Sequence, residues 1–141
     1  MKHNKWNPAF KLDVMNVIKD LSIKGLCVGS SIAQLHEIMG EPELPVARMG
    51  KKSKIYYWLY GNVSFLSEGD YVIAIDIDFH SNRERVITFD KTMNWEINDW
   101  LNLANENEFD INNDNKLFYL THDGISICLS QNGRLGMVSL R

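Results

Sequence analysis

The feature that most constrains this chain is an internal repeat. The segment "KIYYWLYGNVSF" at 54–65 aligns with "KLFYLTHDGISI" at 116–127, matching lysine, tyrosine and serine and keeping most apolar positions apolar. The turns coincide as well, because Gly61-Asn62 falls over Asp123-Gly124. Both dipeptides supply the positive φ angles that a two-residue hairpin requires. The alignment predicts the same antiparallel hairpin in both halves of the chain.

Each copy of the hairpin is followed by a third strand and preceded by a helix. The turns "SEGD" and "SQNGR" lead into "YVIAIDIDF" and "LGMVSL", so each half predicts a three-stranded meander. Before the first meander, "GSSIAQLHEIMGEP" predicts a helix in which Ser31 and Gln34 form a capping box and Gly40 ends the last turn. The two halves therefore share a helix-and-meander unit.

The remaining elements complete an α+β pattern. The helix of the second half is predicted in "NWEINDWLNLANEN", with Asn94 or Thr92 as its cap. Its apolar stripe consists of Ile97, Trp100, Leu101 and Ala104. An additional amphipathic helix is predicted at 10–21, and "RVITF" at 85–89 predicts a further strand. We expect one domain over 1–141, with pseudo-repeats at about 22–80 and 90–141 and with helices on one face of an antiparallel sheet.

Alternation along the strands predicts which side chains lie on the face that the helices leave open. In "DYVIAIDIDF" the isoleucines form an apolar face, which leaves Asp76 and Asp78 on the open face. For the preceding strand, the repeat suggests that Tyr57 faces inward, so Tyr56, Trp58 and Tyr60 are expected to face outward. Outer aromatics support a loop folded over the sheet, pack across neighbouring strands, or form a contact for another protein.

Composition indicates which classes of partner and which cellular compartment to expect. The chain has 141 residues, 45% hydrophobic, with a net charge of −3, which disfavours a nucleic-acid partner. The sequence shows no apolar run typical of a signal peptide or a membrane span. Cys27 and Cys128 make neither a metal spacing nor a disulfide framework. We therefore expect a cytoplasmic protein with free thiols and no membrane partner.

The signals for metal binding or catalysis are weak. Asp76, Asp78 and His80 alternate on one strand and could offer ligands to a metal, but no further residue completes the set, so a solvated strand is preferred. The segment 110–115, "DINNDN", imitates a calcium loop without its central glycine or closing glutamate, and a solvated loop is expected there. His122 lacks a partner nucleophile. We predict no catalytic residue, no metal and no cofactor.

The segments "IKGLCVGSSIAQLHEIMGEPE", "YYWLYGNVSF" and "YVIAIDIDF" resemble sequences of proteins with the β-lactamase-inhibitor-like fold. Small outer-membrane assembly lipoproteins also have that fold, and similar sequence segments occur in bacterial proteins that look like toxin-immunity proteins. The resemblance covers 23–79 and, through the repeat, 92–140. It implies that two tandem units bind a protein through the open sheet face. The chain departs from the lipoproteins and secreted inhibitors by lacking a lipidation cysteine, a signal sequence and a disulfide pattern.

Three hypotheses follow from the sequence. The first is a non-enzymatic immunity-type protein that neutralises a cognate, basic toxin through the open face. Its predicted contact residues are Tyr56, Trp58, Tyr60, Asp76, Asp78, Phe118 and His122. The second is an enzyme or small-ligand-binding protein with a pocket at the junction of the two units. The third is a homodimer formed through the aromatic face.

Overall fold

The computed structural model describes residues 6–141; residues 1–5, part of the N-terminal stretch in which no signal peptide is expected, lie outside the described residues. The helices are α1 (Val14–Asp20), α2 (Ile32–Met39) and α3 (Ile97–Glu106), with a 3₁₀ turn η1 (Asp90–Thr92). The strands are β1 (Leu12–Asp13), β2 (Ala47–Arg48), β3 (Ile55–Tyr60), β4 (Val63–Glu68), β5 (Tyr71–Asp78), β6 (Ile87–Thr88), β7 (Asp110–Asp114), β8 (Leu117–His122), β9 (Ile125–Ser130) and β10 (Leu135–Leu140).

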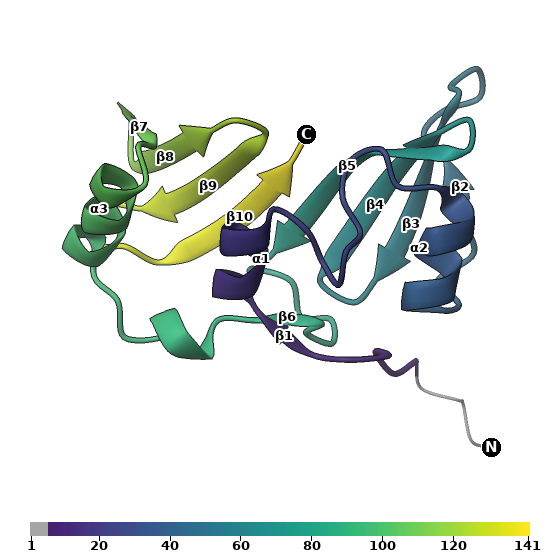
Figure 1. Ribbon diagram of the computed structural model, residues 1–141, viewed down its shortest axis with the longest axis horizontal. Helices are drawn as coiled ribbons and strands as arrows, with labels where there is room; N and C mark the ends of the chain where they lie inside the picture. Colours follow the sequence, from purple (N-terminus) through teal and green to yellow (C-terminus); the bar gives the residue numbers. More distant parts are fainter. Residues whose placement is uncertain (1–5) are drawn as a thin grey trace.

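Eight of these strands form one antiparallel sheet in the order β2-β3-β4-β5-β10-β9-β8-β7. Strands β5 and β10 are the last strands of the two predicted meanders. They pair with each other at the centre of the sheet, with Ile77 opposite Val138. The two meanders therefore join into a continuous sheet (Figure 1). The α+β class expected from the sequence is confirmed at this level.

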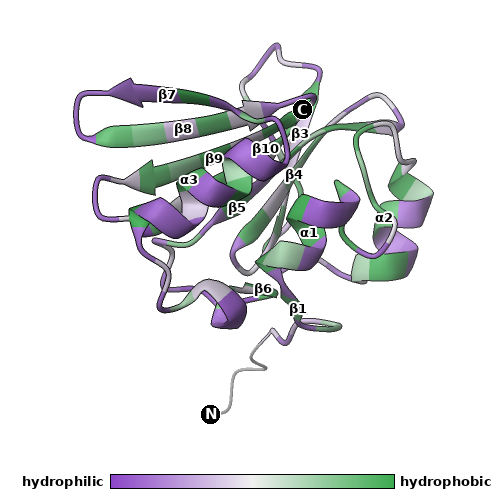
Figure 2. Cartoon of the chain, turned by 60° about the vertical axis from the view of Figure 1, so that its left-hand side comes forward, coloured by the Kyte–Doolittle hydropathy of each residue, from purple (hydrophilic) through white to green (hydrophobic). Residues whose placement is uncertain are grey.

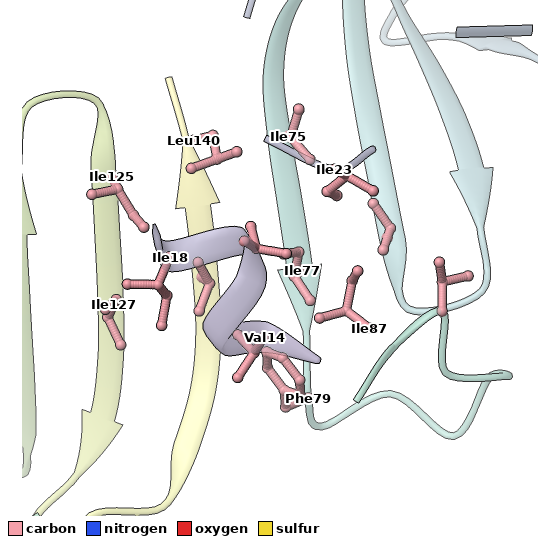
Figure 3. Packing of buried hydrophobic residues seen from close by; sticks show 14 of the residues in the cluster. Val14, Ile18, Ile23, Ile75, Ile77, Phe79, Ile87, Ile125, Ile127 and Leu140 are labelled. Carbon is pink, nitrogen blue, oxygen red and sulfur yellow. The ribbon is translucent and has the colours of Figure 1, made fainter. Parts of the chain in front are cut away.

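The three helices lie on one face of the sheet (Figures 1 and 2). A single buried cluster joins α2, the sheet and α3, and it includes Leu35, Phe65, Leu129 and Trp100. Helix α1 covers the junction of β5 and β10, where Ile18 points toward the isoleucines of β9 (Figure 3). Burying each of these large apolar side chains contributes about 1.5–3 kcal/mol, so both halves depend on a shared core.

Helix α2 forms as the sequence predicts. The Gln34 amide donates to Ser31 Oγ at 3.1 Å, and the Ser31 amide donates to Gln34 Oε1 at 3.4 Å. This reciprocal box satisfies amides at the start of the helix that have no partner within it. Gly40 ends the helix with a φ of 75°, a conformation that glycine adopts without strain.

Helix α1 is shorter than the predicted 10–21 segment. Leu12 and Asp13 are extended, because they pair in parallel with Ile87 and Thr88 of β6. Asp13 then caps α1 by accepting a hydrogen bond from the Met15 amide at 2.9 Å. The predicted strand at 85–89 is present only as the two residues of β6.

The start of α3 also differs from the prediction. The cap is Glu96, whose amide donates to Asp99 Oδ2 at 2.8 Å, rather than Asn94 or Thr92. Thr92 belongs to η1, where its hydroxyl donates to the Phe89 carbonyl. Because η1 forms its own turn, the first turn of α3 begins later than expected.

The segment expected to be a solvated loop, "DINNDN", contains the edge strand β7. It pairs with β8 along its whole length, from Asp110 opposite Thr121 to Asp114 opposite Leu117. All five residues of β7 are exposed. Asparagine and aspartate are poor strand formers, but a polar edge strand remains compatible with solvent and resists pairing with other chains.

Candidate binding surface on the open face of the sheet

The hairpin of β3 and β4 determines which aromatic side chains face the core. Tyr60 pairs with Val63, and Trp58 pairs with Phe65. Directly paired residues of an antiparallel sheet point to the same face. Val63 and Phe65 are fully buried in the core beneath the helices. Tyr60 and Trp58 therefore face the core, and the predicted outward orientation is wrong.

Contacts of Tyr60 and Trp58 show that both stabilise the packing of the sheet. The Tyr60 side chain is fully buried, and its hydroxyl donates to the Gly40 carbonyl at 3.0 Å. Burial, with a smaller effect of the Glu41 carboxylate, raises the pKa of Tyr60 to about 12. The half-buried Trp58 donates from Nε1 to Ser67 Oγ at 3.0 Å. These side chains are held within the fold and do not form an outer patch.

Tyr56 and Phe118 lie on the same inner face. Arg48 packs over the Tyr56 ring and donates from Nη2 to the Tyr56 hydroxyl at 3.1 Å. Phe118 pairs with Leu129 and packs against the core. The prediction that both belong to the open face is therefore wrong for the same reason as for Tyr60.

His122 is also separated from the two predicted aspartates by the sheet. It pairs with buried Ile125, and its ring centroid lies 5.4 Å from that of Phe109. Asp76 and Asp78 lie on the opposite, open face, as predicted, because the intervening Ile77 is buried. The seven predicted contact residues thus fall on two faces and do not form one surface.

A row of polar side chains crosses the open face instead. The row consists of Ser64, Asp76, Ser139, Ser126, Thr121 and Asp110, each paired directly with the next. Small hydroxyl side chains give this part of the face low relief and many hydrogen-bonding groups. The sequence prediction did not include these serines or Asp110 among the contact residues; the strand register is the signal that could have located them.

Asp76 lies at the centre of this row. Arg141 Nη2 lies 3.1 Å from Asp76 Oδ1 and donates to Oδ2 at 3.4 Å. Oδ1 is itself buried and accepts no aligned hydrogen bond from a described residue. The guanidinium of Arg141 is more than half exposed. Solvent screens the Arg141 side of this ion pair, and the partly exposed Asp76 carboxylate retains capacity to accept a hydrogen bond from a partner.

A second row on the open face is more apolar. It runs through Asp78, Met137, Cys128, Tyr119 and Asn112, again as direct pairs. Met137 is 40% exposed, and Tyr119 is half-buried. Burial raises the pKa of the Cys128 thiol, and its hydrogen bond with Tyr119 opposes that shift in part. The thiol is therefore protonated near neutral pH and adds no charge to the face.

Carboxylates outnumber cationic groups on the open face. Pairing and alternation place there Glu68, Asp76, Asp78, Asp110 and Asp114. Among the described strands and the residue after β10, Arg141 is the single cation on this face. The whole chain carries a net charge of −3. The strands thus concentrate negative charge on the side of the sheet that no described helix covers.

The open face has no clear metal-binding chemistry within residues 6–141. Asp78 Oδ1 accepts a hydrogen bond from the His80 amide at 2.8 Å, and the exposed His80 does not join Asp76 in a cluster. Across that part of the chain, no group of three or more His, Cys, Asp or Glu side chains is placed to hold a metal ion. The face offers hydrogen-bonding groups and charge rather than a ligand cage.

Comparison of the chain with protein-family models, with curated proteins and with solved structures finds no match. None of the helices in residues 6–141 is both long and apolar enough to cross a membrane.

Proposed function

We propose that this chain is a non-enzymatic protein-binding module whose open sheet face covers a basic surface of a partner protein. The observation that carries the proposal is the combination of an uncovered sheet face with five carboxylates and one guanidinium. Complementary charge steers a partner toward such a face and fixes its orientation. The more specific role that we propose is that of an immunity-type protein, which neutralises a cognate toxin in the cytoplasm.

The dimensions of the face suit a protein contact. Eight strands at a spacing of about 4.8 Å span roughly 34 Å, and a six-residue strand is about 20 Å long. The resulting area of roughly 700 Å² is close to the ~800 Å² that each partner buries in a standard interface. A partner covering most of the sheet would bury an area typical of a specific complex.

Asp76 and its neighbours supply the expected centre of the contact. A cationic side chain from the partner can reach Asp76 between the hydroxyls of Ser64 and Ser139, which are its direct neighbours. Excluding water there strengthens the ion pair. Met137, on the next row, offers exposed apolar area beside this polar centre.

The sequence resemblance supports the immunity-type role. The glycine-serine helix cap, the helix ending before Pro42 and the hairpin at Gly61 resemble those of the β-lactamase-inhibitor-like fold and of toxin-immunity proteins. The helix and meander in each half agree with that pattern at the level of element order. The proposal differs from the sequence hypothesis in its contact residues, because the aromatic side chains expected outside face the core.

A capture-and-rescue experiment tests the proposed function. Tagged wild-type protein is used to capture partners from the native cell, and each captured protein is then expressed alone and together with this chain. We expect a basic protein that stops growth alone and permits growth when co-expressed with wild type. A captured protein that is harmless, or wild type that fails to restore growth, would remove the immunity-type role.

Matched charge-reversal variants locate the contact in the same experiment. Asp78→Lys combined with Asp110→Lys changes a half-buried and an exposed position of the open face, whereas Glu37→Lys changes an exposed position of α2 on the helix face. We expect the double variant to lose rescue and Glu37→Lys to retain it. The reverse pattern would place the contact on the helix face, and self-association of wild type without another protein would favour a homodimer.

A further inference from the structure

A cleft on the helix side of the sheet has features of a small-molecule site, separate from the open face. It has a volume of about 650 Å³ and lies between α1, the end of α3 and the β8–β9 hairpin. Small-molecule sites commonly measure about 300–1,000 Å³. Figure 1 shows α1 over the junction of β5 and β10 at the centre of the sheet and α3 toward the edge formed by β7 and β8. The cleft therefore borders the junction that α1 covers.

The floor of the cleft is apolar and anchored in the core. Ile18 of α1 and Ile125 of β9 line it, and both are buried (Figure 3). Leu103 and Phe109, which are half-buried and pack against the same core, form the opposite wall. A floor built from core residues keeps its shape without a ligand, which lowers the entropic cost of binding.

Nitrogen groups without a protein partner line the rim. Lys19 and Lys91 reach the cleft from α1 and η1, and neither ammonium forms an ion pair or hydrogen bond with another residue in 6–141. His122, half-buried beside Phe109, forms no hydrogen bond through its ring to the described chain. The carboxylate of Asp20 is the single acidic group among the lining residues. A lining with these three nitrogen groups and a single carboxylate favours an anionic ligand.

The helix dipole accounts for the position of Lys19 but not for that of Lys91. Lys19 lies in the last turn of α1, where a cation stabilises the helix dipole, whereas Lys91 belongs to η1. Asp13 links η1 to the first turn of α1, because its Oδ1 accepts from the Met15 amide and its Oδ2 accepts from the Lys91 amide at 3.1 Å. Met15 and Lys91 both line the cleft, so its rim is fixed by one side chain.

We propose that the cleft binds a small amphipathic carboxylic acid. Its carboxylate lies among Lys19, Lys91 and His122, and its hydrocarbon body lies on the floor formed by Ile18 and Ile125. The site is independent of the proposed protein contact, because it opens on the helix-covered face and uses none of the open-face residues.

Calorimetric titration with a matched set of eight-carbon ligands tests this proposal. Octanoate, 1-octanol and octylammonium share one hydrocarbon chain and differ in the charge of the head group. We expect octanoate to bind at least about tenfold more tightly than 1-octanol, and octylammonium to bind most weakly. Equal binding of acid and alcohol, tightest binding of the amine, or no binding of octanoate would overturn the proposal.

Variants of the wild-type chain locate the bound acid. Lys19→Gln and Lys91→Gln should each weaken octanoate binding by about three- to tenfold. Lys24→Gln is the matched control, because its ammonium lies over the Phe10 ring outside the cleft. Leu103→Trp should block the cleft while leaving the lysines in place. If Lys24→Gln has the same effect as Lys91→Gln, or if Leu103→Trp leaves binding unchanged in a folded protein, the acid binds elsewhere.

Discussion

Asn62, in the turn between β3 and β4, is almost fully buried. Its Oδ1 accepts hydrogen bonds from the amides of Val86 and Ile87, and its Nδ2 donates to the Ile87 carbonyl. One side chain therefore satisfies three backbone groups of the segment that enters β6. The sequence predicts a turn at Gly61-Asn62, but it does not reveal this role, because the partners lie more than twenty residues away.

Replacing Asn62 with alanine should be strongly destabilising. Each buried backbone group that loses its partner costs about 1–3 kcal/mol, so we expect Asn62→Ala to lower the free energy of unfolding by at least about 2 kcal/mol. Urea denaturation measures the change. Asn102→Ala, at an exposed position of α3, is the control and should change stability by less than about 0.5 kcal/mol. Similar values for the two variants would contradict the role of Asn62.

Tyr60 gives a prediction about alkaline pH. Its folded-state pKa of about 12 lies above the ordinary value of 10.0, because burial and the Glu41 carboxylate disfavour the phenolate. The contribution of Tyr60 to stability is therefore complete below pH 10 and is lost as pH rises toward 12. The loss amounts to about 2–3 kcal/mol, at ~1.4 kcal/mol per pH unit.

Denaturation of the wild type and of Tyr60→Phe across this pH range measures the effect of Tyr60 ionisation. Lysines also titrate in this range, but they do so in both proteins. The wild type should lose more stability than Tyr60→Phe between pH 10 and 12. At neutral pH the variant should be less stable by about 1 kcal/mol, since it lacks the hydrogen bond to the Gly40 carbonyl. Parallel alkaline curves for the two proteins would show that Tyr60 ionises without cost to the fold.

The error in the predicted aromatic face also arises at the scale of single residues. The sequence places Val63 and Phe65 inward, and the two-residue turn puts Tyr60 opposite Val63. Those two inferences together require Tyr60 to face inward. Aligning Tyr57 with Tyr119 by their repeat position was the weaker guide, because tyrosine is compatible with either face of a sheet.

At the scale of secondary-structure elements, two helix caps should differ in their effect on stability. Ser31→Ala removes one capping bond of α2 and should cost about 1 kcal/mol. Asp13→Ala removes the cap of α1 and also the acceptor of the Lys91 amide, so we expect about 2 kcal/mol. Urea denaturation of both variants measures these costs. Equal losses would show that the bond to Lys91 contributes no stability.

How well the elements could be predicted depends on how local their signals are. Helix α2 and both hairpins match the sequence prediction, because the capping box and the turn dipeptides act within four residues. Helix α1 begins later than its periodicity suggests, since β1 pairs with β6 more than seventy residues away. Strand β7 was missed because its polar composition hides a strand that forms only by pairing with β8.

At the scale of the whole molecule, the central pair of β5 and β10 is the feature that creates one broad face. Both strands are apolar on their inner side, and neither carries a local signal for its partner across the chain. The acidic residues of β5 and β7 therefore come to share a face only in the folded protein. The candidate surface could be predicted from sequence at Asp76 and Asp78, but its extent follows from this long-range pairing.

Charge is also separated along the sheet. Strand β2 and the turn that follows it expose Arg48, Lys51, Lys52 and Lys54 at one edge of the sheet, where they lie near Glu68 but away from the row through Asp76 and Asp110. A basic partner is therefore attracted to the open face and repelled from this edge. Because these charges are exposed, the attraction should weaken as salt screens it.

The measurement that tests the central claim most directly is the affinity of the captured partner for open-face and helix-face variants, by surface plasmon resonance. Asp78→Lys combined with Asp110→Lys should weaken binding at least tenfold, about 1.4 kcal/mol. Glu37→Lys should bind like wild type, and association should slow with added salt. Unchanged affinity of the double variant, or an equal loss in Glu37→Lys, would contradict binding through the open face.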